Sequence, residues 1–74
     1  MKVKVTYVKT YEEVVELKDA PEADEYVKQV MDEEKYSEEG LLALEEKLLD
    51  YFDLESSYDL IRVDDMAGKT LIEW

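Results

Sequence analysis

The sequence predicts an α+β fold in the order ββααββ, a small antiparallel sheet with two helices packed on one face. Three observations predict it. Apolar and polar residues alternate in the first segment, apolar residues recur every three or four positions through the middle, and β-rich runs return around a glycine near the end. A chain of 74 residues has the length of one domain, so we expect residues 1–74 to form a single unit.

The first two elements are expected to be strands. Val3–Tyr7 alternates apolar and polar residues, as a half-buried strand does, and Val14–Leu17 is a second β-rich run. No Gly, Asn or Pro between them marks a tight turn. We therefore expect a hairpin with a loop of about four or five residues near Lys9–Glu12. One long bent strand over residues 3–17 is the alternative.

A first helix is expected after Asp19. Pro21 stands at an early helical position, and Glu22 supplies a carboxylate to the first turn. Apolar residues then recur at helical spacing, and the helix is expected to run to about Glu34. Its core-facing stripe consists of Ala23, Tyr26, Val27, Val30 and Met31. Its outer face is expected to carry Asp24, Glu25, Lys28 and Asp32.

A second helix is expected after Ser37, which is the N-cap candidate. It should end near Asp53–Glu55. Its core stripe consists of Leu41, Leu44, Leu48 and Phe52, with Leu42 and Leu49 on the flank.

The chain is expected to close with a second hairpin. We expect strands at Tyr58–Val63 and Thr70–Trp74. The turn between them is expected at Met66–Lys69, where Gly68 can adopt a positive φ. The terminal Trp74 either caps the sheet core or lies in a homodimer contact.

The residue inventory argues against an enzyme. The chain has no histidine and no cysteine, so its serines lack a histidine to activate them and no thiol nucleophile exists. Two glycines cannot build a phosphate-binding loop, and the acidic segment around residues 33–40 does not match a calcium-binding loop. We expect neither a metal site nor any cofactor.

The charge is strongly negative and unevenly placed. The formal net charge is −12, and residues 12–59 hold 18 acids against 4 bases. This balance argues against direct binding to nucleic acid or to an anionic membrane, both of which require cations. No apolar run approaches the ~20 residues of a membrane span. We expect a basic protein surface as partner, and the absence of cysteine favours the cytoplasm.

The acids of the second helix fall on one side. Glu39, Glu46, Asp50 and Asp53 lie within about 60° of one another on a helical projection. They stand opposite the core stripe, so this row points outward. Neighbours at such positions lie ~5–6 Å apart, comparable with the interval between phosphates along a nucleic-acid strand.

The acidic joint between the helices extends this surface, and Tyr36 within it is placed to stack on an arginine of a partner. The alternative is a solvated face that only keeps the protein soluble. The residues that we expect to bind a partner are Asp32, Glu33, Glu34, Tyr36, Glu38, Glu39, Glu46, Asp50 and Asp53.

The segment Lys2–Tyr7, the run Glu16-Leu17-Lys18 and the acidic helix opening at Glu22 together resemble small DpnD/PcfM-like proteins of phages and conjugative elements of Firmicutes. That resemblance implies a mobile-element protein, in the cytoplasm of a bacterial host, with no catalytic residues. More broadly, a small acidic α+β chain without catalytic groups is similar in type to phage anti-CRISPR proteins and other DNA mimics. This implies an inhibitor that occupies the cationic groove of a nucleic-acid-binding host protein such as a CRISPR effector.

A second hypothesis comes from a different class of function. The chain could be a structural or regulatory adaptor that associates through an edge strand or through an apolar patch near Trp74. Binding of that kind would tolerate salt, whereas electrostatic mimicry would not.

Overall fold

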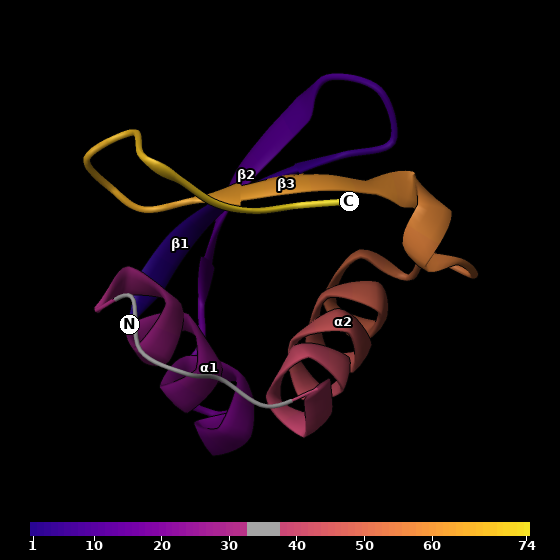
Figure 1. Ribbon diagram of the computed structural model, residues 1–74. Helices are drawn as coiled ribbons and strands as arrows, with labels where there is room; N and C mark the ends of the chain where they lie inside the picture. The colour runs from indigo at the N-terminus through magenta and orange to yellow at the C-terminus, as the bar shows by residue number, and fades with distance from the viewer. Residues whose placement is uncertain (33–37) are drawn as a thin grey trace.

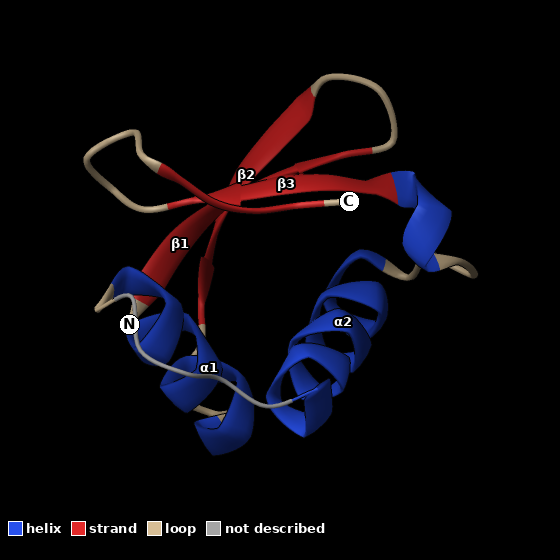
Figure 2. Ribbon diagram, viewed as in Figure 1, coloured by secondary structure: helices blue, strands red, loops and turns tan. Residues whose placement is uncertain are grey.

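The computed structural model, which describes residues 1–32 and 38–74, has the predicted α+β architecture with its elements in the predicted order. A four-stranded antiparallel sheet lies on one side, and the helices lie together against one of its faces (Figures 1 and 2). The elements are β1 (Lys2–Tyr7), β2 (Tyr11–Glu16), α1 (Pro21–Met31), α2 (Glu38–Phe52), a 3₁₀ turn (Ser57–Asp59), β3 (Leu60–Asp64) and β4 (Thr70–Glu73).

The sheet has the order β2-β1-β3-β4, so β1 is an inner strand and β2 an edge. β1 and β2 form the expected hairpin and not one bent strand. Its loop is shorter than expected and lies at residues 8–10, because Tyr11 and Glu12 are already paired with β1. Val8 closes the turn early by adopting a positive φ of 64°, and its N–H donates to the carbonyl of Asp59 at 2.6 Å.

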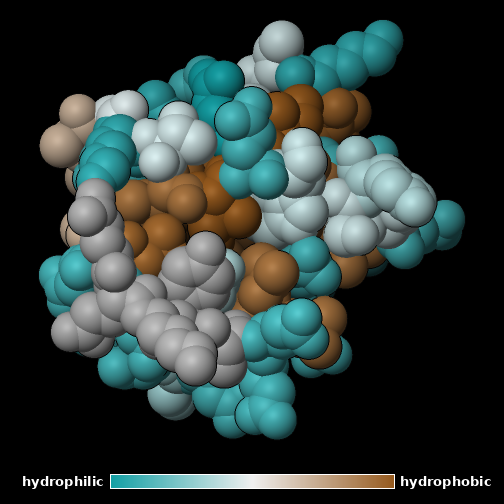
Figure 3. Space-filling model, viewed as in Figure 1, coloured by the Kyte–Doolittle hydropathy of each residue, from teal (hydrophilic) through white to brown (hydrophobic). Residues whose placement is uncertain are grey.

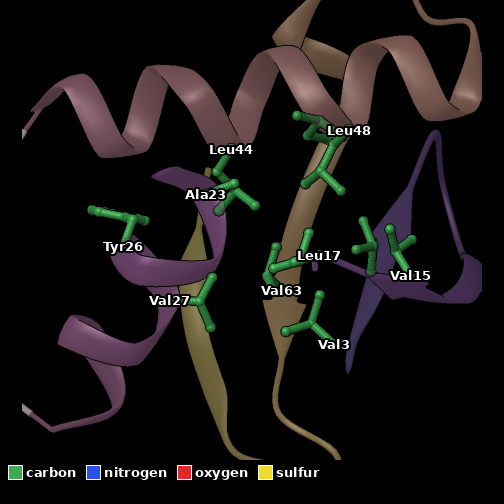
Figure 4. Packing of buried hydrophobic residues seen from close by; sticks show 11 residues of the cluster. Val3, Val15, Leu17, Ala23, Tyr26, Val27, Leu44, Leu48 and Val63 are labelled. Carbon is green, nitrogen blue, oxygen red and sulfur yellow. The ribbon is translucent and has the colours of Figure 1, made fainter. Parts of the chain in front are cut away.

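The core lies between the inner face of the sheet and the two helices. Val3, Val15 and Val63 point from the sheet toward α2, where Leu44 and Leu48 meet them (Figure 4). All five side chains are fully buried. Their alternation in the strands and four-residue spacing in the helix are the patterns that the sequence displays. α1 completes the core through Ala23, Tyr26 and Val27.

One expected flank residue lies on the wrong side of its helix. Leu42 is 56% exposed. At ~100° per residue it stands about 200° from Leu44, so it points away from the core that Leu44 enters. Leu49, the other expected flank residue, does pack against the core.

The first helix ends earlier than expected. α1 stops at Met31, and Asp32 is its C-cap, with an N–H that donates to the carbonyl of Lys28. Met31 is also the last residue of α1 that packs against the core. The expected end at Glu34 and the expected N-cap Ser37 lie outside the described residues.

The second helix ends in a Schellman motif. The N–H of Leu54 donates to the carbonyl of Leu49 at 2.8 Å, and the N–H of Asp53 donates to that of Asp50. Asp53 itself has a φ of 54°, in the left-handed region. The helix therefore finishes at Phe52, and Asp53 is the first residue beyond it.

The last strands also differ at their ends. The expected strand from Tyr58 begins only at Leu60, because Ser56 caps a 3₁₀ turn by accepting the N–H of Tyr58 at 3.2 Å. β3 and β4 form the expected hairpin. Trp74 follows β4, and its indole Nε1 donates to a carboxylate oxygen of Glu45 at 2.7 Å, which places the ring against α2.

Candidate functional site

The helical side of the molecule carries a groove that neither helix forms alone. One hollow of about 310 Å³ lies where the first turn of α2 meets α1, and a second of about 440 Å³ adjoins it along the helices. Pro21 and Glu22 line both hollows, so the two share a border and together make up the depression on this side of the helices. Hydrophilic residues lie along the lower margin of the face in Figure 3, where the helices lie, and apolar residues show between them.

Carboxylates from both helices converge on this depression. Its acidic lining residues are Glu22 and Glu25 of α1 and Glu39, Glu46 and Asp50 of α2, and we call this set the acidic groove. All five side chains are exposed. None forms an ion pair or hydrogen bond with another described residue. The acidic groove therefore presents unneutralised charge to any ligand that enters it.

Other acids of the helical layer are neutralised within the protein. Lys28 Nζ lies 2.8 Å from a carboxylate oxygen of Asp24, and the N-terminal ammonium group contacts the other oxygen. Lys28 first, and then the ammonium group, hold the pKa of Asp24 below its usual value. The expectation that Asp24 lies on the outer face is thus wrong. Its side chain is only 15% exposed, because it reaches toward the start of β1.

The lysine that borders the acidic groove is similarly engaged. Lys47 lines the second hollow, but its Nζ lies 2.9 Å from a carboxylate oxygen of Asp19. This contact lowers the pKa of Asp19 and turns the lysine charge toward the loop before α1. The groove consequently keeps its negative sign.

The residues expected to bind a partner divide into three groups. Glu39, Glu46 and Asp50 lie in the acidic groove. Asp32 and Glu38 are exposed at the facing ends of α1 and α2, and Asp53 is exposed but lies beyond the helix. Three further candidates, Glu33, Glu34 and Tyr36, fall outside the described residues.

Two groove residues are not among the expected binders. In the sequence, Glu22 and Glu25 are explained as acids near the start of the first helix that complement the helix dipole. The sequence does carry one signal for their role, because a spacing of three residues places both carboxylates on the same side of α1. Only the packing of α1 against α2 shows that this side faces the acids of the second helix.

The groove also has an aromatic and a small residue at its base. Tyr26 and Gly40 line the first hollow, and both are buried.

Among the described residues, no group of three or more acids, histidines or cysteines is placed to hold a metal ion. Nor does any described helix combine the length and apolar character needed to cross a membrane.

Comparisons with known proteins found no relative of this chain. The sequence matches no family model, and neither the curated proteins nor the solved structures gave a match.

Proposed function

We propose that this protein is a non-catalytic inhibitor, of the phage type, that binds a basic nucleic-acid-binding protein, such as a CRISPR effector, in place of its nucleic acid. The observation that supports the proposal is the acidic groove, in which two helices hold five exposed carboxylates that form no ion pair with a described residue. A solvated face needs no such convergence, whereas a cationic groove would be complementary to it.

The dimensions of the two-helix layer suit this role. Along α2, Glu39 and Glu46 are separated by about 10 Å and Glu46 and Asp50 by about 6 Å at 1.5 Å of rise per residue. These intervals are comparable with the interval between phosphates along a nucleic-acid strand. Glu22 and Glu25 of α1 add carboxylates beside this row.

Binding of this kind has a kinetic signature. Complementary fields accelerate encounter, and exposed charges are screened beyond ~8 Å at physiological ionic strength. Association should therefore be fast at low salt, and affinity should fall steeply as salt is added.

The proposal can be tested by capture and elution. Tagged protein is incubated with nuclease-treated bacterial lysate at low salt, and bound proteins are eluted first with a duplex DNA oligonucleotide and then with high salt. We expect the DNA to release the specific partner, since both ligands would occupy one cationic groove. The E46K/D50K variant should capture little, and a variant with the same charge change elsewhere, E55K/E73K, should capture normally.

Three results would count against mimicry. If E46K/D50K captures as well as the unmodified chain, the acidic groove is not the binding surface. If DNA does not displace the partner, the partner is held somewhere other than its nucleic-acid site. Capture that survives high salt would instead support the adaptor hypothesis, in which the contact is made by an edge strand or by an apolar patch near the partly exposed Trp74.

A further inference from the structure

The sheet has two edges, and they are unequal. β4 is four residues long, its pairing with β3 is interrupted by a register shift, and α1 lies against it. β2 is six residues long, and its register with β1 is unbroken. Its first four residues are exposed. β2 contains no proline, lysine or bulge, and the charge of its three glutamates is what guards this edge.

The backbone groups on the open edge can be assigned from the register. The N–H of Leu17 donates to the carbonyl of Met1 at 2.9 Å, so this pair is hydrogen-bonded. Antiparallel pairs alternate between hydrogen-bonded and non-hydrogen-bonded, and the register is continuous. It follows that Glu12, Val14 and Glu16 direct their N–H and C=O groups away from β1. Within the part of the chain that the structure describes, those groups have no partner, so they can pair with another strand.

The charge on β2 discriminates between possible occupants. The strand holds Glu12, Glu13 and Glu16 and no cation. Pairing with a second copy of β2 would place three glutamates from each chain along one seam, and like charges facing each other destabilise a sheet. An extended segment that carries lysine or arginine would meet the opposite sign.

The negative charge is concentrated at one end of the edge. Glu16 is engaged by the N-terminal ammonium group at 3.0 Å. Glu12 has only an exposed contact with Lys4 at 3.4 Å, and Glu13 has no ion pair with a described residue. At the Glu16 end, a hollow of about 420 Å³ lies between β2 and α2. It is lined by Val14 and Tyr51 together with Lys2, Glu16, Lys18, Asp19 and Lys47.

We propose that β2 receives an extended cationic segment of a partner protein, which adds to the sheet as a fifth strand beside Glu12–Glu16. Main-chain hydrogen bonds would supply affinity, and a basic side chain on the face of the sheet that carries Glu13 would supply selectivity. An apolar side chain on the opposite face would lie beside Val14, at the border of the hollow. This surface is separate from the acidic groove, and the inference does not depend on the function proposed above.

The test uses a defined probe, the acetylated and amidated peptide Lys-Val-Lys-Val-Lys-Val, titrated into the isotope-labelled full chain. We expect amide exchange at Glu12, Val14 and Glu16 to slow by about tenfold or more at saturation, because these N–H groups become hydrogen-bonded. The same peptide with every backbone amide N-methylated keeps its charge and loses its donors. It should bind at least about tenfold more weakly.

A variant of the protein gives an independent measurement. V14P removes an N–H that points away from β1 and leaves the hydrogen bonds between β1 and β2 in place. Edge strands tolerate proline at such positions. It should weaken peptide binding by about tenfold or more, while V14T, which keeps the N–H, should bind normally. E46K/D50K should also bind normally, which separates this inference from the proposed function.

The inference is overturned if the N-methylated peptide binds as well as its parent, or if exchange slows at the acidic groove and not along β2. It is equally overturned if the unmodified chain shows no exchange change at β2 up to millimolar peptide. Because the peptide comparison uses the unmodified protein, it holds even if V14P fails to fold.

Discussion

At the scale of single residues, Asp53 shows that a residue can continue the charge pattern of a helix without lying in that helix. On a helical projection it continues the row of Glu46 and Asp50. In the structure it stands at the first position beyond α2 with a φ of 54°. Glycine is the preferred residue there, because the left-handed conformation brings a β-carbon close to the following carbonyl. The carboxylate also opposes the negative end of the helix dipole.

Replacement of Asp53 by glycine should therefore stabilise the protein. We expect D53G to raise the free energy of unfolding by about 0.5–1 kcal/mol, as relief of backbone strain and of the dipole outweighs the added chain entropy. Urea denaturation measures it. D53A removes the charge and keeps the β-carbon, so equal stability of D53G and D53A would show that the backbone at Asp53 is unstrained.

At the scale of elements, the approach of the two helices depends on Gly40. A β-carbon built there would lie 2.8 Å from Cβ and 2.9 Å from Cδ2 of Tyr26. Both contacts are shorter than real β-carbon contacts, and Cβ of Tyr26 cannot move without its helix. The glycine therefore sets how closely the start of α2 lies against α1, and with it the width of the first hollow of the acidic groove.

Replacement of Gly40 by alanine should destabilise the protein, although alanine is the better helix former. The gain in helix propensity is up to about 1 kcal/mol, and overpacking typically costs about 1–3 kcal/mol. We expect a net loss near 1 kcal/mol in chemical denaturation. As a control, A43G should lose stability through propensity alone. A G40A variant more stable than the parent would contradict the close contact.

At the scale of the whole molecule, the net charge of −12 produces a repulsion that can extend across the entire protein. The principal extents are 29, 24 and 21 Å. At 0.01 M ionic strength the screening length is about 30 Å, so every surface acid repels every other, whereas at 0.15 M it is about 8 Å and only neighbours interact. The compact state confines this charge more than the unfolded chain does.

Salt should consequently stabilise the fold. We expect the Tm to rise by several degrees between 0.01 M and 0.5 M sodium chloride, measured by thermal unfolding followed by circular dichroism. E46K/D50K, which changes the formal net charge from −12 to −8, should show a smaller rise. An unchanged Tm across this range would mean that the folded and unfolded chains bear the repulsion equally.

Local patterns account for much of the architecture. Alternation in β1 and the four-residue spacing of Leu44 and Leu48 depend only on the geometry of strands and helices, so the sequence displays them directly. The predicted boundaries differ by a few residues where a local contact decides. Ser56 caps a 3₁₀ turn in place of a strand, and Val8 shortens a loop that carries no glycine.

The candidate site is less visible in the sequence. The outward positions of Glu46 and Asp50 follow from periodicity, because a residue opposite a core stripe must face solvent. Glu22 and Glu25 join them only through the packing of α1 on α2, and Asp24 leaves the outer face only because the start of β1 lies within reach. No periodicity encodes such contacts between elements.

The sequence by itself determined the order of the elements, their core faces and the negative sign of the surface, since these are properties of local spacing and composition. The tertiary structure decided which acids share a groove, which are neutralised by Lys28 and Lys47, and which strand edge stays open. Those depend on distances between residues far apart in the chain, and such distances are set only when the elements pack.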